Sequence, residues 1–594
     1  MEFSESSLPS TAGEAVNSSS PSYSALELSE SDACSGGEGR DDGTPYQKGF
    51  KGILRRMLPC FLLLVISAVF LLIFSLWTSP FYRHWYGCDC SFFTMVGRGI
   101  TEGMVPYRDF FDLKGPYFFF IEALGQLLHS DRLGIYLIQI PFLWASLILV
   151  YKLCGLYLTR GKTVAVLIIF LFGHISILWG GNTLEEYMLP LNLLVIWLAV
   201  RYLKLNSLKK DSIPGYLPFI AGICFGIMLF AKVTVASPIL GVCAGLGIAL
   251  LAYRRYAELL KAVLLFIVGA LLAAVPMLLF FYLHGSLSEM FYCVFKFAFL
   301  RSVDFSDPFS LKWELKLAAC FLGIFTALFH IPVSEKEPAG KALGTDEQNE
   351  GPQYSVRYAV RRVCGWVRRK YTGASFRQIP IELCLILIFM SLFTYILLHL
   401  GNPWIYYFMT TEPILVLSCV LLFSIYDPLV LFSSLRQAVC LITLGVYIFG
   451  FGMSSLDTIQ TFLYDRDNYW YEKYYQDAQN IALLIPEVER DSVFSFDIDM
   501  TFFEATRIMP CNRYQINLQF FIALNPEIET ELMDFFEKTP PKWMVISETL
   551  DQYLPQFWEV IMKKYHCLYF NEAGCLYILN DSDGSYSRGV RVVE

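Results

Sequence analysis

The sequence predicts a polytopic α-helical membrane protein that carries a small α/β domain at its C-terminal end. Over 594 residues the hydrophobic share is 55%, the charged share is 17% and the mean hydropathy is +0.47, which excludes an ordinary soluble enzyme. Apolar runs recur up to residue 452, and about 20 helical residues suffice to cross a hydrocarbon core of about 30 Å. Beyond residue 453 the hydropathy changes, and short strand and helix patterns alternate.

Residues 1–49 form the first predicted unit, a disordered cytoplasmic tail. They are rich in Ser, Gly, Glu and Asp and show no apolar period, so they have too little apolar surface to build a core. Basic residues flank the cytoplasmic ends of membrane helices, and four of them precede the first apolar run. These four, which place the N-terminus in the cytoplasm, are Lys48, Lys51, Arg55 and Arg56.

Residues 50–453 form the second predicted unit, a membrane domain with about eleven spans. An odd number of spans, starting from a cytoplasmic N-terminus, places the C-terminus on the outer side. The apolar runs that define the spans are 58–78, 132–157, 163–180, 187–205, 216–231, 234–253, 259–283, 313–333, 379–400, 404–425 and 437–452.

The charges of the loops agree with this orientation. The short predicted outer turns, 181–186 and 401–403, contain neither Lys nor Arg, whereas the predicted inner loops are basic. The longest inner loop, 334–377, ends in VRYAVRRVCGWVRRKY, where valines recur at helical spacing. This pattern predicts a basic amphipathic helix that anchors the loop to the cytoplasmic membrane surface.

The predicted first outer loop, 80–131, concentrates charge at the membrane surface. A charged side chain in this position costs free energy unless it is solvated, paired with an opposite charge or engaged in function. We therefore look for functional residues in this loop first. Its apolar segment 117–128 is too short to span and is expected to lie along the outer interface. Besides Asp89, the charged residues in the middle of the loop, within PYRDFFDLKGP, are Arg108, Asp109, Asp112 and Lys114.

Residues 454–594 form the third predicted unit, an α/β domain outside the membrane. Helical patterns cover 469–484, 529–538 and 556–565, and they alternate with strand patterns at 492–496 and 543–547 and a hairpin at 567–579. Such alternation is typical of a compact α/β fold. Cys567 and Cys575 flank the turn of the hairpin and could pair in an oxidising compartment.

Several classes of function find no support in the sequence. There is no phosphate-binding Walker loop, no dinucleotide fingerprint, no HEXXH motif and no cysteine spacing suited to zinc. The net charge of −8 divides between acidic termini and basic loops, so nucleic acid is not an expected partner. The simplest interpretation of Asp109, Asp112 and Lys114 in PYRDFFDLKGP is an ion-paired turn that holds the first outer loop in place.

Charged residues in three consecutive outer turns are the candidate site. Asp89 follows the first span by about ten residues, Glu185 and Glu186 lie in GNTLEEYMLPLN, and Lys232 lies in the next tight turn. Short turns between packed helices converge, so these side chains are expected to meet. Carboxylates beside a cation suit a lipid phosphate substrate and a hydroxyl that must lose its proton. Arg301, in a later outer loop, is a further candidate for binding phosphate.

Three motifs carry a resemblance to a known family. Asp89 begins a D-x-S-x-F pattern followed by G-x-G, PYRDFFDLKGP comes next, and N-x-x-E-E-Y-x-L-P starts at Asn182. Together with the order of spans, loop and C-terminal domain, they resemble the GT-C glycosyltransferases of membranes. The resemblance is greatest to the bacterial branch of protein O-mannosyltransferases and lipid A aminoarabinose transferases.

The resemblance implies transfer of a sugar, with inversion, from a polyprenyl-phosphate donor to an acceptor on the outer face of the plasma membrane. Asp89 would be the general base, and Glu185 or Glu186 would orient the acceptor. Lys232 would contact the donor phosphate. Arg108, Lys114 and Arg301 are the further candidates for binding substrate.

The partners implied are the lipid-linked donor, a glycan, lipid or protein acceptor, and membrane lipids. No cofactor is required by the motifs. A divalent cation is left open, but Cys90 follows Asp89 where many relatives have a second acidic residue, which argues against a metal-bridging role for Asp89. A flippase or transporter and a polymerase of lipid-linked glycans are the alternatives, and the charges on one membrane face favour the transferase over a transporter.

Overall fold

The computed structural model describes most of the membrane domain and of the C-terminal domain. The described residues are 45–82, 84, 86–302, 318–330, 379–399, 404–425, 442, 445, 448–450, 452–460, 463, 469–516, 518–547 and 555–580. Residues 1–44 of the predicted tail, the basic loop 334–377 and most of the predicted last span lie outside them.

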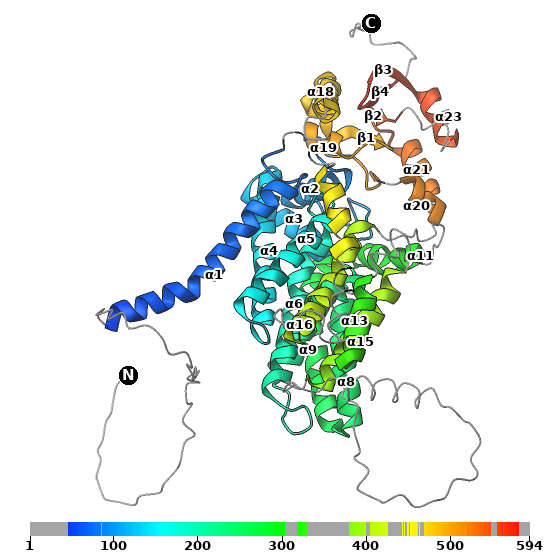
Figure 1. Ribbon diagram of the computed structural model, residues 1–594. Coiled ribbons are helices and arrows are strands. Elements are labelled where there is room, and N and C mark those ends of the chain that lie inside the picture. The colour runs from blue at the N-terminus through cyan, green and yellow to red at the C-terminus, as the bar shows by residue number, and fades with distance from the viewer. Residues whose placement is uncertain are drawn as a thin grey trace, which may run out of the picture. The chain divides into compact units, whose positions relative to one another are not determined.

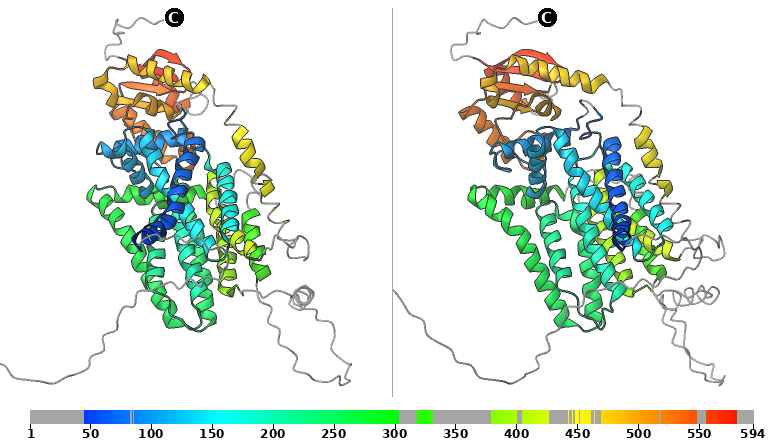
Figure 2. Two further views of the ribbon diagram at one scale, coloured as in Figure 1. Left: turned by 60° about the vertical axis from the view of Figure 1, so that its left-hand side comes forward. Right: turned by 90° about the vertical axis from the view of Figure 1, so that its left-hand side faces the viewer.

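The chain is a multi-pass membrane protein, as predicted. Within the described residues, eight helices are long and apolar enough to cross a membrane. They correspond to eight of the predicted spans, and Figure 1 and both views of Figure 2 show most of them running side by side. The eight comprise α1 (Pro45–Phe74, from Met57), α4 (Arg132–Gly155), α5 (Arg160–Leu178), α6 (Leu184–Leu205), η1 with α8 (Val233–Ala236, Ser237–Ala252), α9 (Tyr256–Leu283), α15 (Ile381–Leu398), and η3 with α16 (Ile405–Thr411, Glu412–Ile425).

Three predicted spans do not appear as long helices in the described part of the chain. The run at 216–231 is the short helix α7 (Tyr216–Leu229), and that at 313–333 contains α13 (Ala318–His330). Most of the run at 437–452 is not described. The count of eleven therefore stays a prediction.

Glycines let the helices approach closely, as expected where lipid supplies no hydrophobic driving force between them. A Cβ added at Gly222 of α7 would lie 2.0 Å from the carbonyl oxygen of Phe266 on α9. A Cβ at Gly241 of α8 would lie 2.4 Å from the Met390 backbone on α15. These two helix pairs are packed backbone against backbone.

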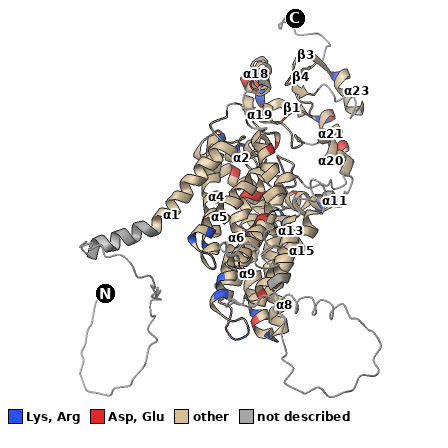
Figure 3. Cartoon of the chain, in the orientation of Figure 1, with Lys and Arg blue, Asp and Glu red and all other residues tan. Residues whose placement is uncertain are grey.

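The predicted inner loops contact one another at one end of the helices. The ammonium group of Lys204 lies 4.1 Å from the ring centroid of Tyr157, and that of Lys209 lies 4.9 Å from the ring of Tyr253. Arg255 donates to the carbonyl oxygen of Leu208 at 2.8 Å. Figure 3 shows Lys and Arg gathered at these helix ends, around α8 and α9.

The predicted first outer loop folds into two helices, α2 (Cys88–Thr101) and α3 (Pro116–Leu128). The segment α3, which begins with Pro at its first turn, matches the predicted short apolar segment. The sequence analysis did not predict α2. Gly97 of α2 allows close packing, because a Cβ there would lie 2.7 Å from the backbone of Glu122 on α3. Three short helices, α10 (Leu287–Phe291), η2 (Tyr292–Phe297) and α11 (Ala298–Ser302), follow α9.

The C-terminal domain is a small α/β fold, as predicted. Its four-stranded sheet has the order β1-β2-β4-β3, in which β1 and β2 are parallel and the other neighbours are antiparallel. The parallel pair needs a crossover, and α21 lies in that connection. The elements are α18 (Tyr469–Leu484), η4 (Glu487–Ser492), β1 (Val493–Phe496), α19 (Thr501–Thr506), α20 (Leu518–Leu524), α21 (Glu527–Lys538), β2 (Trp543–Ile546), α23 (Pro555–Lys564), β3 (Tyr565–Asn571) and β4 (Gly574–Leu579).

A buried ion pair ties α2 to this domain. Arg98 of α2 donates to the carbonyl oxygen of Phe503 on α19 at 3.1 Å, and its guanidinium lies 3.8 Å from the Glu504 carboxylate. Both charged residues are 5% exposed. Burial raises the pKa of Glu504, and the charges of Arg98 and Arg507 oppose this rise. The backbone N–H of Phe111 also donates to the backbone carbonyl oxygen of Arg513 at 2.7 Å, so the loop has a second attachment to the C-terminal domain.

We expect Glu504→Ala to destabilise the protein by about 3–5 kcal/mol, because it leaves the buried guanidinium of Arg98 without its carboxylate. Thermal unfolding in detergent, followed by tryptophan fluorescence, measures the change. The control is Asp534→Ala, which removes an exposed carboxylate 2.7 Å from Lys538 on the surface of α21. Its cost should stay below about 1 kcal/mol. Equal shifts for the two variants would contradict a buried role for the Arg98–Glu504 pair.

Candidate active site

Asp89 lies in the first turn of α2, where its half-buried carboxylate meets a tyrosine from a distant segment. The Tyr406 hydroxyl donates to Oδ2 of Asp89 at 3.3 Å. Tyr406 belongs to η3 and is 5% exposed. The N-terminus of a helix carries partial positive charge, so the Asp89 carboxylate lies at the end of α2 that favours an acidic side chain.

Glu185 and Lys232 form an ion pair at the start of α6. The ammonium nitrogen of Lys232 lies 2.8 Å from Oε1 of Glu185, whose side chain is 2% exposed. The same ammonium lies 3.0 Å from the ring centroid of Tyr407, where the ring electrons attract it. A buried carboxylate needs such a cation, because burial without one costs several kcal/mol.

The short helix η3 brings the two parts of the candidate site together. Tyr406 contacts Asp89, Tyr407 contacts Lys232, and the centroids of the two tyrosine rings are 4.9 Å apart. Three predicted outer turns therefore meet through η3. Sequence analysis missed both tyrosines, because aromatic residues beside an outer turn are common at membrane interfaces.

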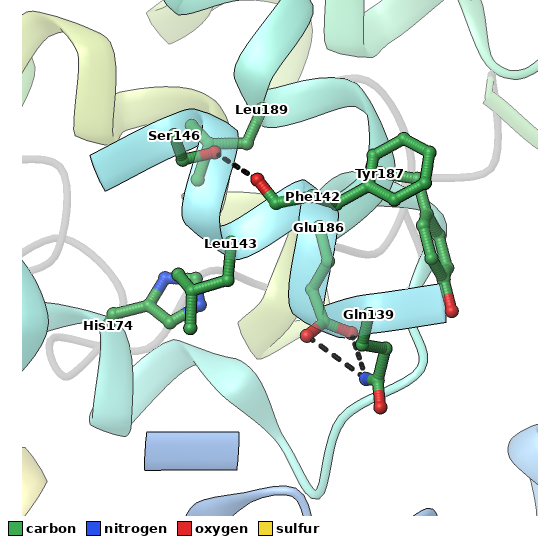
Figure 4. A pocket seen from close by; sticks show the side chains of 8 residues that line it. All are labelled: Gln139, Phe142, Leu143, Ser146, His174, Glu186, Tyr187 and Leu189. Carbon is green, nitrogen blue, oxygen red and sulfur yellow. Dashed lines mark hydrogen bonds between the residues drawn. The ribbon is translucent and has the colours of Figure 1, made fainter. Parts of the chain in front are cut away.

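Glu186 faces away from the Lys232 pair and holds the start of α6. Its Oε2 accepts from the Thr183 backbone at 2.8 Å and from the Gln139 amide at 3.2 Å. The first of these bonds belongs to a capping box. Figure 4 shows Glu186 and Gln139 on the wall of a small pocket that also includes His174 and Tyr187, with room for about one water molecule.

The cations of PYRDFFDLKGP occupy different surroundings. Arg108 makes two hydrogen bonds to Asp109, at 2.9 and 2.7 Å, and its side chain is about half exposed. Burial opposes ionisation of Asp109, but bonds from Arg108 and the Val105 backbone outweigh it and lower the pKa of Asp109. This is a local ion-paired turn of the kind predicted for the loop.

Lys114 instead lies beside α2. Its ammonium is 4.3 Å from the ring centroid of Phe93 and 3.8 Å from the Asp112 carboxylate. Lys114 thus lies against the helix that carries Asp89. Arg301 is on α11, and its side chain is not among those described.

Other buried groups surround the start of α2. Glu122 on α3 is fully buried, and desolvation raises the pKa of its carboxyl well above the usual range. Asn182 and Tyr187 lie nearby, joined by a hydrogen bond of 2.6 Å. Among the described residues, no three His, Cys, Asp or Glu side chains are grouped as metal ligands.

These features define a class of fold. A multi-pass helical domain, a helical first loop that carries an acidic residue, and a C-terminal α/β domain together give a GT-C-like fold. The resemblance drawn from the sequence motifs is thereby confirmed at the level of the fold.

Solved structures of this class cover nearly the whole chain. ArnT from Cupriavidus metallidurans bound to undecaprenyl phosphate has a TM-score of 0.50 at 13% identity, over 89% of this chain and 99% of that chain. Its apo form has a TM-score of 0.50 at 13% identity, over 87% and 97%. An Archaeoglobus fulgidus oligosaccharyltransferase tethered with an acceptor peptide has a TM-score of 0.41 at 13% identity, over 90% and 75%. No protein-family model and no curated protein sequence matches the chain.

The Lys232–Glu185 pair yields a stability prediction. Lys232→Met should cost about 3–5 kcal/mol, because the buried Glu185 loses its cation. Adding Glu185→Gln to Lys232→Met should recover most of that loss, since both charges are then gone. Thermal unfolding of the single and double variants in detergent measures the coupling. Lys261→Met is the control, because Lys261 is half exposed and 3.7 Å from Glu258. A Lys232 variant as stable as this control would contradict the buried pair.

Proposed function

We propose that the chain is a membrane glycosyltransferase that moves a sugar from a polyprenyl-phosphate donor to an acceptor hydroxyl. Asp89 is the general base of this reaction. The observation that carries the proposal is the half-buried Asp89 carboxylate at a helix N-terminus, which Tyr406 and Tyr407 of η3 connect to the Lys232–Glu185 pair. The fold shared with ArnT, whose structure contains undecaprenyl phosphate, supports a lipid-linked donor.

The reaction is a single displacement at the anomeric carbon. Asp89 takes the proton of the acceptor hydroxyl while the acceptor oxygen forms its bond to the sugar. The bond between the anomeric carbon and the phosphate oxygen breaks, and polyprenyl phosphate leaves with the bonding electrons. Attack from the face opposite the leaving group inverts the configuration. The chain needs to supply only a base and a cation, since phosphate is a good leaving group once its charge is compensated.

Lys114 is the cation we assign to the donor phosphate. It lies over the ring of Phe93 on α2, the helix that carries Asp89. Arg108 is a poorer candidate because both of its hydrogen bonds go to Asp109 on the exposed side of the loop. Lys232 contributes positive charge from the other side of η3 while it compensates Glu185.

Glu185 is the acidic residue we assign to orienting the acceptor. The carboxylate of Glu186 is engaged by a backbone N–H and by Gln139, which leaves it a capping role. Glu185, in contrast, touches the Lys232 ammonium at the candidate site. We place the reaction on the outer face of the plasma membrane, with the N-terminus in the cytoplasm. The basic predicted inner loops, which contact one another away from the site, support this orientation.

Loss of the base should abolish most of the activity. We expect Asp89→Asn to lower kcat about 10²- to 10⁴-fold, the usual contribution of general base catalysis. The measurement is transfer of radiolabelled sugar from a polyprenyl-phosphate sugar by the purified protein. Asp109→Asn is the control, since Asp109 is paired with Arg108 in the same loop. A folded Asp89→Asn protein with full activity would refute the assignment, and movement of donor between leaflets without glycoside formation would refute the transferase.

Loss of the phosphate-binding cation should weaken donor binding. We expect Lys114→Gln to raise the KM for the donor about tenfold or more, because a charge-assisted hydrogen bond to a phosphate contributes about 1.5–3 kcal/mol. Arg108→Gln should leave this KM within about twofold. Steady-state kinetics at varied donor concentration separate the two variants. If Arg108→Gln has the larger effect, the phosphate lies on the other side of the loop.

A further inference from the structure

The turn between α5 and α6 has an unusual backbone. Its first four residues all have positive φ: 51° at Trp179, 83° at Gly180, 90° at Gly181 and 59° at Asn182. Such angles suit glycine but cost a non-glycine residue roughly 1 kcal/mol or more. A side chain in this region persists only where its surroundings favour it. The positive φ angles of Trp179 and Asn182 therefore need a structural explanation. For Asn182, the contacts of its side chain provide one.

The middle of this turn packs against the start of α2 through one indole ring. The backbone N–H of Trp77 donates to the Gly180 carbonyl oxygen at 3.0 Å. A Cβ at Gly180 would lie 2.5 Å from the Trp77 ring, and a Cβ at Gly87 would lie 2.3 Å from the same ring. Gly87 caps α2 and stands two residues before Asp89. Gly180 of the turn and Gly87 of the α2 cap thus both lie against the same indole ring.

The end of the turn makes a polar contact with α2. The Asn182 amide nitrogen donates to Sγ of Cys90 at 3.3 Å, and its carbonyl oxygen accepts from the Tyr187 hydroxyl at 2.6 Å. Asn182 and Tyr187 are fully buried and Cys90 is 3% exposed. Cys90 directly follows Asp89, so this contact is made one residue from the carboxylate.

The start of α6 has other supports. Thr183 and Glu186 form the capping box of α6, and Glu186 is also bonded to Gln139. Of the two side-chain bonds given above for Asn182, one goes to Tyr187 on α6 and the other to Cys90, the neighbour of Asp89. The Asn182 amide therefore connects α6 to the first turn of α2.

We propose that Asn182 is a positioning residue for the base, and that the left-handed turn Trp179–Asn182, with Trp77, sets the place of Asp89 on α2. The inference rests on the proposed function of Asp89. A carboxylate that takes a proton during bond formation must be aligned with the acceptor hydroxyl. A misplacement of about 1 Å costs roughly 10²-fold in rate.

The first experiment measures kcat and donor KM separately for Asn182→Gly, Cys90→Ala and Cys90→Ser. Glycine keeps the positive φ and removes only the amide. Serine at residue 90 retains an acceptor for the Asn182 N–H, whereas alanine does not. We expect Asn182→Gly and Cys90→Ala to lower kcat about 10- to 100-fold with donor KM unchanged, and Cys90→Ser to stay within about threefold of wild type.

A second pair of variants tests the indole contact. Gly180→Ala adds a methyl group against the Trp77 ring, and Gly103→Ala adds one at a similar φ of 93° with no atom within 4 Å. Both introduce backbone strain, but only the first should lower kcat. Wild-type kcat in Asn182→Gly would overturn the proposal. Equal losses in Cys90→Ala and Cys90→Ser, or in the two glycine variants, would also overturn it.

Hydrogen exchange separates this proposal from the proposed function. Amide exchange over the first turn of α2 should be several-fold faster in Asn182→Gly than in wild type, and unchanged in Gly103→Ala. If the wild type transfers no sugar, the proposed function fails. The comparison of amide exchange between Asn182→Gly and wild type still tests whether Asn182 positions the first turn of α2. If exchange in Asn182→Gly equals that of wild type, the positioning role is wrong even when the enzyme is active.

Discussion

The ion pair between Lys232 and Glu185 is the interaction on which the candidate site depends. A carboxylate that is 2% exposed must keep its cation close, so the turn before η1 cannot move away from the start of α6. The Tyr407 ring covers the same ammonium and adds η3 to the assembly. Tyr406, next along η3, then reaches Asp89. One buried charge pair thus determines where four segments of the chain meet.

The helix that carries Asp89 is held at both ends. Near its start, Trp77 and Asn182 connect α2 to the turn between α5 and α6. Near its end, Arg98 reaches α19 of the C-terminal domain through bonds to Phe503 and the charge of Glu504. A residue proposed as a base needs rigid support to keep its geometry within a fraction of an ångström. The C-terminal domain provides part of this support, because it holds the end of α2 through Arg98.

The convergence of the turns at the candidate site was predictable, and the contacts that sequence analysis missed have a physical explanation. Asp89, Glu185 and Lys232 were expected to converge because short turns between packed helices end at a common surface, and η3 does connect them. Tyr406 gave no signal that distinguishes it from an interfacial aromatic residue. The contact between Asn182 and Cys90 joins residues 92 apart, and that between Arg98 and Phe503 joins residues 405 apart. No local pattern encodes such pairs.

Sequence alone determined the multi-pass membrane class and the α/β character of the C-terminal domain, because hydropathy and periodicity are local properties of a chain. It also located the acidic turns that contain Asp89, Glu185 and Glu186. Tertiary structure decided which of two adjacent glutamates meets Lys232 and which caps α6. Neighbouring residues on a helix point about 100° apart, so their roles depend on what packs against each face. That information resides in η1, η3 and α4, far from Glu185 and Glu186 in the sequence.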